Sequence, residues 1–170
     1  MTTVEGKALV VLSQEGVARI RDLEDQFALA VRQRELLDTY IRERLTPGKH
    51  FYHIGDGQKN NLTKEGAELI CLPHGYKPSY QKLAGPDSPT EDGSPFQITV
   101  LCRLLRGDVF GGEGIGSARS YQTSRIGEYK PRQRVPGLCH NATLKMAQKS
   151  AYIAATLNAT AASEFFTQDM

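Results

Sequence analysis

The sequence predicts a fold that combines helices with antiparallel strands, and three segments carry that prediction. Residues 22–45 place apolar side chains at steps of three and four, with arginine and glutamate on the opposite face, as in an amphipathic helix. Residues 96–105 alternate apolar with mixed side chains, and a turn at 106–108 leads into a second arm over 109–120, which predicts a long hairpin. A last helix is predicted over 141–158.

Shorter elements are predicted between these segments. Residues 51–54 are typical of a short strand, and 62–72 of a short helix capped by Asn61 or Thr63. A strand is expected over 76–83, and Pro78 confines it to a sheet edge or a bulge. Residues 84–95 are rich in proline, glycine and acid, which predicts a loop. We expect residues 1–21 to be an N-terminal arm and 22–170 a single domain.

Composition limits the class of protein. With 170 residues, 39% of them hydrophobic, the chain can bury one good core. No apolar run approaches the roughly 20 residues that span a bilayer, and the start lacks the pattern of a signal peptide, so we expect a soluble, intracellular protein without a membrane partner. The cysteines Cys71, Cys102 and Cys139 form no even framework, so reduced thiols are expected.

Positive charge is concentrated near the C-terminus. From Arg119 onward there are seven lysines and arginines against three acids, whereas the preceding 118 residues hold fourteen bases and sixteen acids. Such a local field suits a polyanion, and tyrosines among the cations suit single-stranded nucleic acid, because rings stack on bases while cations track phosphates. A solvated surface loop is the alternative. The candidate contacts in this segment are Arg119, Tyr121, Arg125, Tyr129, Lys130, Arg132 and Arg134.

The predicted last helix carries two distinct stripes. Ala147, Ala151 and Ala154 lie on one, and their small size allows close packing on a sheet or on a neighbouring subunit. Lys145 and Lys149 lie on another, one turn apart, where like charges repel by a few tenths of a kcal/mol. An anion between the two lysines would relieve that repulsion, although simple solvation would also serve. The alanine stripe and the apolar stripe of the first helix together predict a homo-oligomer.

Other chemistries find little support in the sequence. The glycines of residues 111–116 match neither a dinucleotide fingerprint nor a P-loop, and they favour bulges or a close approach of another backbone or a phosphate chain, so no ATP site is predicted. Zinc ligation by Cys71, His74, Cys139 and His140 would require poor ligand spacing. Neither the loop carboxylates nor the histidines form a catalytic set. We therefore predict no enzyme activity, no metal and no cofactor.

Four segments in order resemble one family. They are the helix ending at 40–44, the segment FYHIGDGQKNNLTKEGAELI at 51–70, the hairpin at 96–120 with its Gly-x-Gly second arm, and the lysine-bearing helix at 144–166. Over about Leu36 to Phe166 the chain resembles the single-strand annealing proteins of the Rad-fifty-two superfamily, which includes related phage recombination proteins. It departs from the family at Lys149-Ser150-Ala151, where the family often has Lys-Arg-Ala.

The resemblance implies an α+β fold, with a curved antiparallel sheet, a long hairpin and a helix laid across them in a β-β-β-α core. It implies ATP-independent binding of single-stranded DNA and annealing of complementary strands in recombination or repair, by a ring or helical homo-oligomer in the cytoplasm of a bacterial or phage-infected cell. By matching position, Lys149 lies where the family has a lysine of the inner groove, and Lys59, or its neighbour Gln58, lies where the family has a groove-lining arginine. Lys145 lies on the same helix face as Lys149. The alternative is a nonspecific single-strand-binding module, or a scaffold that recruits a recombinase, without annealing activity.

Overall fold

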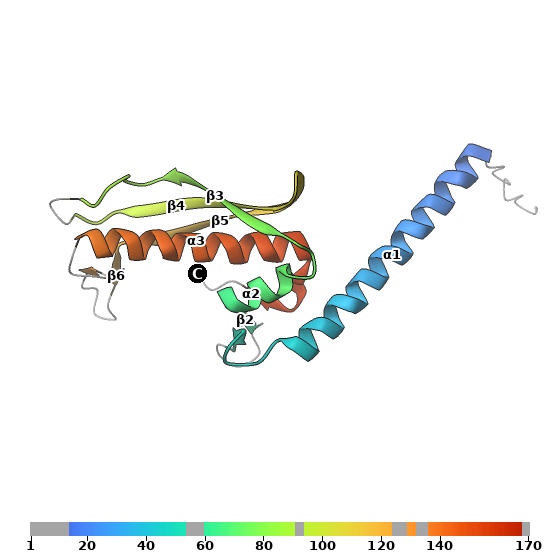
Figure 1. Cartoon of the computed structure of the whole chain (residues 1–170), viewed down its shortest axis with the longest axis horizontal. Coiled ribbons are helices and arrows are strands. Elements are labelled where there is room, and N and C mark those ends of the chain that lie inside the picture. The colour runs from blue at the N-terminus through green and yellow to red at the C-terminus, as the bar shows by residue number, and fades with distance from the viewer. Residues whose placement is uncertain (1–13, 54–59, 91–93, 124–128, 132–135, 168–170) are drawn as a thin grey trace, which may run out of the picture. The chain divides into compact units, whose positions relative to one another are not determined.

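The computed structural model describes residues 14–53, 60–90, 94–123, 129–131 and 136–167. The chain divides into two compact units, Met1–Glu43 and Arg44–Met170. The fold class is α+β, as predicted (Figure 1).

In the residues that the structure describes, the first unit is one long helix, α1 (Gln14–Arg44). It begins eight residues earlier than predicted, because Ile20 extends the apolar stripe and no helix breaker separates it from Leu23. Side-chain pairs one turn apart support its polar faces, as between Arg42 Nε and Asp38 Oδ2 at 2.9 Å. The apolar stripe is buried at Leu37 and Ile41 but exposed toward the N-terminus, where Phe27 is 69% exposed.

The second unit is built on an antiparallel sheet in the order β3-β4-β5, formed by β3 (Lys77–Ala84), β4 (Gln97–Arg106) and β5 (Val109–Arg119). The predicted hairpin is therefore present, and Gly107 takes a positive φ of 60° in its turn. Along β4 the buried side chains alternate, as the apolar pattern predicted. They are Ile98, Val100, Cys102 and Leu104, with Leu101 buried as well.

The last helix, α3 (Pro136–Thr160), runs along β5 in the opposite chain direction (Figure 1). A Cβ atom added at Gly116 or Gly114 would come closer than 3.0 Å to the backbone nitrogens of Ala151 and Ala155, respectively. One at Gly112 would meet the Cβ of Ala159 at 2.8 Å. The glycines of β5 thus mark the close approach of another backbone, which is one of the two predicted roles. The other predicted role, a bulge, is also present: Leu104 pairs with Gly112 and Leu105 with Phe110, so Gly111 of β5 has no partner on β4.

This glycine–alanine contact depends on matched repeats. Two residues of strand advance about 6.7 Å and four residues of helix about 6 Å, so every second residue of β5 meets every fourth residue of α3.

The glycine–alanine contact also corrects the expectation that the alanine stripe meets another subunit. The buried members of the alanine stripe, Ala147 and Ala151, pack against the chain's own sheet, so that stripe gives no support to an interface with another subunit.

Helix α2 (Lys64–Cys71) packs against α3. The Sγ atom of Cys71 lies 3.3 Å from the hydroxyl oxygen of Thr156 on α3, and both side chains are buried. The helix is one residue shorter at its C-terminal end than predicted, and Thr63, one of the two predicted caps, is its N-cap. Its hydroxyl accepts a hydrogen bond from the backbone N–H of Gly66 at 3.1 Å and faces the carbonyl oxygens of Lys49 and His50 as acceptors at 2.9 and 3.0 Å.

Replacing Thr63 with alanine should destabilise the second unit. The change removes the acceptor for the Gly66 N–H and the donor to the preceding loop, so the free energy of unfolding should fall by about 1–2 kcal/mol. Urea unfolding followed by circular dichroism measures this difference. Thr63→Ser keeps the hydroxyl and should retain most of the stability. Equal losses in both variants would show that the cap contributes nothing.

Two small sheets complete the unit. One has the order β1-β2-β8, from β1 (Phe51–Tyr52), β2 (Asn60–Leu62) and β8 (Phe166–Thr167), with the short 3₁₀ helix η1 (Ala162–Glu164) before β8. The parallel pairing of β2 with β8 joins the two ends of the unit, and the rings of Phe51 and Phe166 lie 5.6 Å apart. Leu62 was predicted to begin a helix. It belongs instead to β2, because this pairing with a distant segment has no local signal.

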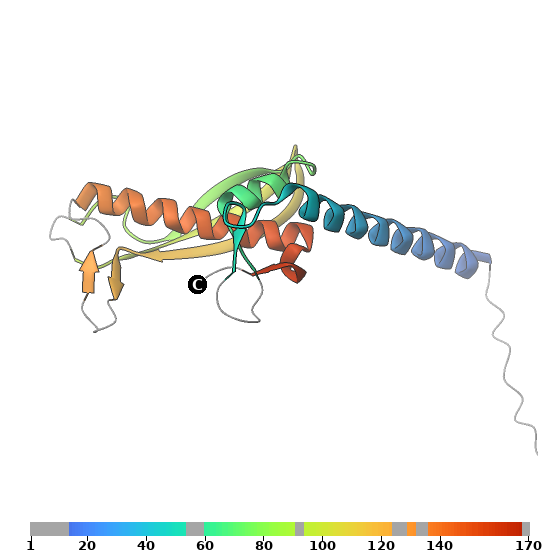
Figure 2. The same cartoon turned by 90° about the horizontal axis from the view of Figure 1, so that it is seen from below.

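The other small sheet corrects the predicted basic loop, which was expected to run to Leu138. Strand β6 (Tyr121–Thr123) pairs antiparallel with β7 (Tyr129–Pro131), and α3 begins at Pro136, five residues before the predicted start. Proline is favoured in the first turn of a helix, since its missing N–H has no partner there. The β6–β7 hairpin lies beside the first turns of α3 in both views (Figure 1, Figure 2).

Candidate nucleic-acid interface

The two helix lysines point away from the sheet. Lys145 lies two residues from both Thr143 and Ala147, which are fully buried, and two residues turn a helical side chain by about 200°. Lys149 has the same relation to Ala147 and Ala151. Both lysines are exposed, one turn apart, on the face of α3 opposite β5.

Lys149 has an acidic neighbour that the sequence did not reveal. The pKa of Glu65, in the first turn of α2, is lowered, first by a hydrogen bond from its own backbone and in smaller part by Thr63 and by the charges of Lys149 and Lys64. Glu65 therefore supplies part of the negative charge that was expected from a bound anion between the two lysines. Lys145 forms no ion pair with an acidic side chain in the part of the chain that the structure describes, so it is the stronger candidate for a phosphate contact.

Arg119 lies on the other side of the layered unit. Alternate residues of β5, from Gly112 to Ala118, are buried toward α3, so Arg119 projects from the opposite face of the sheet. Its Nε atom donates to Oε1 of Gln97 on the neighbouring strand at 3.4 Å. The structure therefore does not bring Arg119 together with Lys145 and Lys149.

The remaining predicted residues are only partly placed. Tyr121 begins β6 and is half-buried. Tyr129 and Lys130 lie on β7, where only the backbone is described. The other four predicted residues lie outside the described part of the chain, and their role in binding stays a prediction. They are Lys59, Arg125, Arg132 and Arg134.

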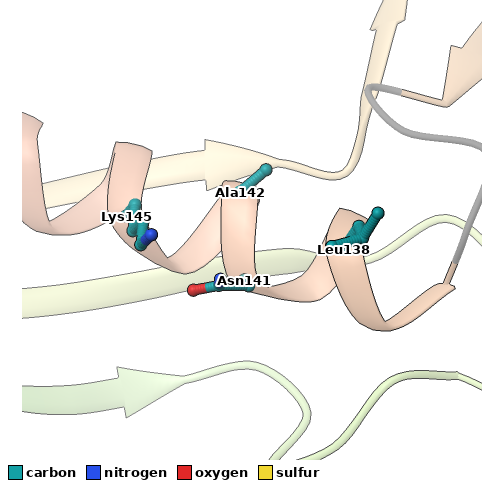
Figure 3. Close-up of a pocket in the computed structure, with 4 residues that line it drawn as sticks. All are labelled: Leu138, Asn141, Ala142 and Lys145. Carbon is teal, nitrogen blue, oxygen red and sulfur yellow. The ribbon is translucent and has the colours of Figure 1, made fainter.

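A shallow hollow lies beside Lys145. Its volume is about 220 Å³, and the lining residues that the structure describes come from successive turns of α3 (Figure 3). The lining residues are Leu138, Asn141, Ala142 and Lys145. Sequence reasoning missed this hollow because it placed the start of the helix at residue 141, although the spacing of 138, 141, 142 and 145 is that of one helix face.

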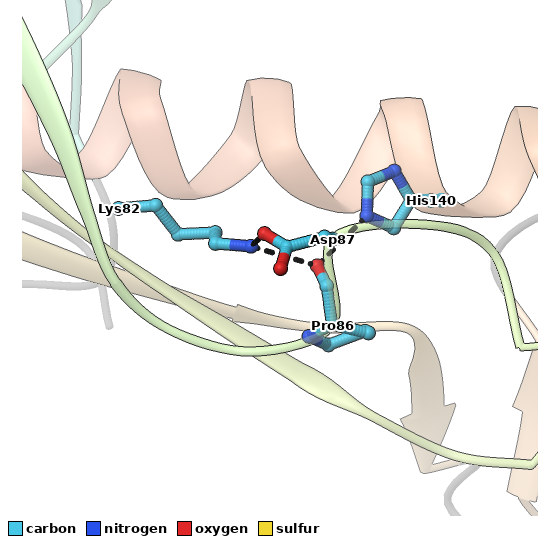
Figure 4. A network of polar contacts seen from close by, with 4 residues as sticks. All are labelled: Lys82, Pro86, Asp87 and His140. Atoms are coloured by element: carbon cyan, nitrogen blue, oxygen red, sulfur yellow. Dashed lines mark hydrogen bonds and ion pairs between the residues drawn. The ribbon is translucent and has the colours of Figure 1, made fainter.

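A network of polar contacts holds the loop after β3 against the start of α3 (Figure 4). Lys82 Nζ pairs with the carboxylate of Asp87 and donates to the carbonyl oxygen of Pro86 at 3.2 Å. His140 Nε2 lies 3.2 Å from the same carbonyl oxygen, which can only accept, so Nε2 carries the proton. The hydrogen bond and charge of Lys82 hold the pKa of Asp87 below its usual value. These contacts fix the first turns of α3, on which the hollow lies.

The cysteines are placed for packing. Cys71, Cys102 and Cys139 are all free and buried. Burial raises the pKa of Cys102 to about 12, so this thiol is protonated at neutral pH and is a poor nucleophile. In the described part of the chain, no group of three or more histidine, cysteine or acidic side chains is placed to hold a metal ion. The helices of that part include none that is long and apolar enough to cross a bilayer.

Comparison with known proteins gives no family assignment. Models of protein families find no match in the chain, and neither does a search of curated proteins. The geometry of the chain itself is therefore the basis for any functional proposal.

Proposed function

We propose that the protein binds single-stranded DNA along the solvent face of α3 and anneals complementary strands without ATP. The observation that carries this proposal is the pair of exposed lysines, Lys145 and Lys149, one turn apart on a helix whose opposite face is fixed to a sheet. A helix held in this way presents its ammonium groups at a constant spacing, and a flexible polyanion can follow them. The annealing of two strands needs no nucleotide hydrolysis, because base pairing supplies the free energy.

The layered unit supports the same proposal. We propose that β3, β4, β5 and α3 form the curved sheet and crossing helix implied by the resemblance to the Rad-fifty-two superfamily. Three antiparallel strands and, after the short β6–β7 pair, a helix that lies along β5 are consistent with that β-β-β-α order. In this proposal the protein acts by holding and aligning strands in the cytoplasm of a bacterial or phage-infected cell, and it is not an enzyme.

Self-association is also part of the proposal, and it now rests on α1. Ile20, Leu23, Phe27 and Val31 form an apolar stripe whose members are between 41% and 69% exposed. A contiguous apolar stripe of this kind on a surface helix is typical of an interaction site. We propose a homo-oligomer in which this stripe is covered, and light scattering of the full chain with and without DNA measures its mass.

Two complementary oligonucleotides carrying a donor and an acceptor dye test the proposed activity. With no nucleotide present, the protein should make energy transfer appear faster than in a protein-free mixture. Anisotropy of a single labelled strand measures binding separately. Binding without faster pairing would favour the alternative, a nonspecific coating protein or recruiting scaffold. An unchanged anisotropy at micromolar protein and low salt would overturn the proposal.

A further inference from the structure

The hollow on α3 combines three kinds of chemistry within about two turns of helix. Leu138 and Ala142 supply an apolar surface, Asn141 an amide, and Lys145 an ammonium group (Figure 3). Leu138 is 56% exposed, and Met146, one turn after Ala142, is 42% exposed. The face of α3 that meets β5 is filled by other, small residues such as Ala147 and Ala151.

These groups suit a ligand that has a flat apolar surface, a hydrogen-bonding edge and a nearby negative charge. A nucleotide has all three. An inorganic anion would use Lys145 but would gain nothing from Leu138, and an aliphatic ligand would leave Asn141 and Lys145 without a role. The amide of asparagine both donates and accepts, so it can pair with the edge of any base and makes its best bidentate pair with adenine.

We propose that this hollow holds one unstacked nucleobase of a bound single strand, with Lys145 against the phosphate of the same or the next nucleotide. This inference rests on the proposed function and goes beyond it, because a groove made of cations alone would not distinguish a strand with bases from one without. Asn141 and Lys145 are separated by one turn, a rise of about 6 Å, so base and backbone can be contacted together. The network of polar contacts among Lys82, Asp87, the Pro86 carbonyl and His140 holds the first turns of α3, which carry the lining residues, against the loop after β3.

The test compares two labelled single strands of equal length, one of deoxyadenosines and one of abasic sugars, on the full-length protein. The wild type should bind the strand with bases more tightly. Asn141→Ala and Leu138→Ser should each reduce that affinity by about fivefold, the effect of one modest contact, and leave the affinity for the abasic strand unchanged. Lys145→Gln should weaken binding of both strands by similar factors.

The matched control is Gln81→Ala, which removes an exposed amide from β3 on the sheet and should change neither affinity. Circular dichroism melting confirms that each variant is folded. Equal wild-type affinity for the two strands would overturn the inference while leaving the proposed function intact. So would a loss in Asn141→Ala that is the same for both strands. A wild-type protein that binds neither strand would overturn the proposed function, and the inference with it.

Discussion

Replacing Gly116 with alanine should come close to unfolding the second unit. The added methyl group would lie closer than 3.0 Å to the backbone nitrogen of Ala151 and to the carbonyl oxygen of Ala147. Backbone atoms inside a helix cannot move aside as a side chain can, so α3 must separate from β5 along its length. We expect the free energy of unfolding to fall by about 3 kcal/mol or more, at the upper end of what overpacking costs. Urea unfolding followed by circular dichroism measures it.

Gly137→Ala is the control for this change. Gly137 lies in the first turn of α3, where the nearest atom to an added Cβ is Pro89 Cγ at 4.0 Å. Alanine there meets no obstacle and favours the helix, so stability should stay equal or rise by up to about 1 kcal/mol. If Gly116→Ala unfolds at the same urea concentration as the wild type, the glycine–alanine contact is not as close as the structure indicates.

Neutralising Lys145 and Lys149 together should sharply weaken binding of single-stranded DNA. Each phosphate contact contributes about 0.7 to the slope of log affinity against log salt, so losing two lowers that slope by about 1.4. At 0.1 M salt this electrostatic contribution corresponds to a loss of affinity of roughly fivefold for each lysine and about 25-fold for the pair. Glu65 lies near Lys149, so Lys145→Gln should have the larger single effect. Anisotropy titrations at several salt concentrations measure both quantities.

Two further variants define the expected pattern. Lys77→Gln removes an exposed lysine from β3, on the sheet, and should leave the slope unchanged. Glu65→Gln removes the carboxylate near Lys149 and should strengthen binding. A salt slope in the Lys145→Gln, Lys149→Gln double variant equal to that of the wild type would place the DNA away from α3.

The sequence predicted the elements that have a strong periodic pattern. The alternation of residues 96–105 identified β4, and the spacing of apolar residues identified α1 and most of α3. It did not predict β2, β6, β7 or β8, which have two or three residues each. Strands this short have no measurable period and form because a distant segment pairs with them, so no local pattern announces them.

In the candidate site too, the sequence predicted what depends on local spacing and missed what depends on distant segments. The sequence placed Lys145 and Lys149 on one stripe of a helix and the alanines on another, and the structure agrees. It could not say that the alanine stripe meets the chain's own sheet, because that depends on the glycines of β5 lying opposite. The sequence also grouped Arg119 with the two lysines, because it did not show which face of β5 meets α3. The alternation of β5 places Arg119 on the face of the sheet away from α3.

Because every second residue of β5 meets every fourth residue of α3, the glycine–alanine contacts would be nearly the same at two different positions of α3 along β5. If α3 slid by one turn, Ala155, Ala151 and Ala147 would again oppose Gly112, Gly114 and Gly116. Contact between small residues thus selects a spacing but not a unique position along it. That position is marked at the two ends, by Asn158 Nδ2 donating to the carbonyl oxygen of Glu113 at 2.8 Å and by Cys139 Sγ donating to that of Ser120 at 3.3 Å. These two hydrogen bonds therefore fix the position of α3 along β5, and with it the positions of Lys145 and Lys149 relative to the sheet.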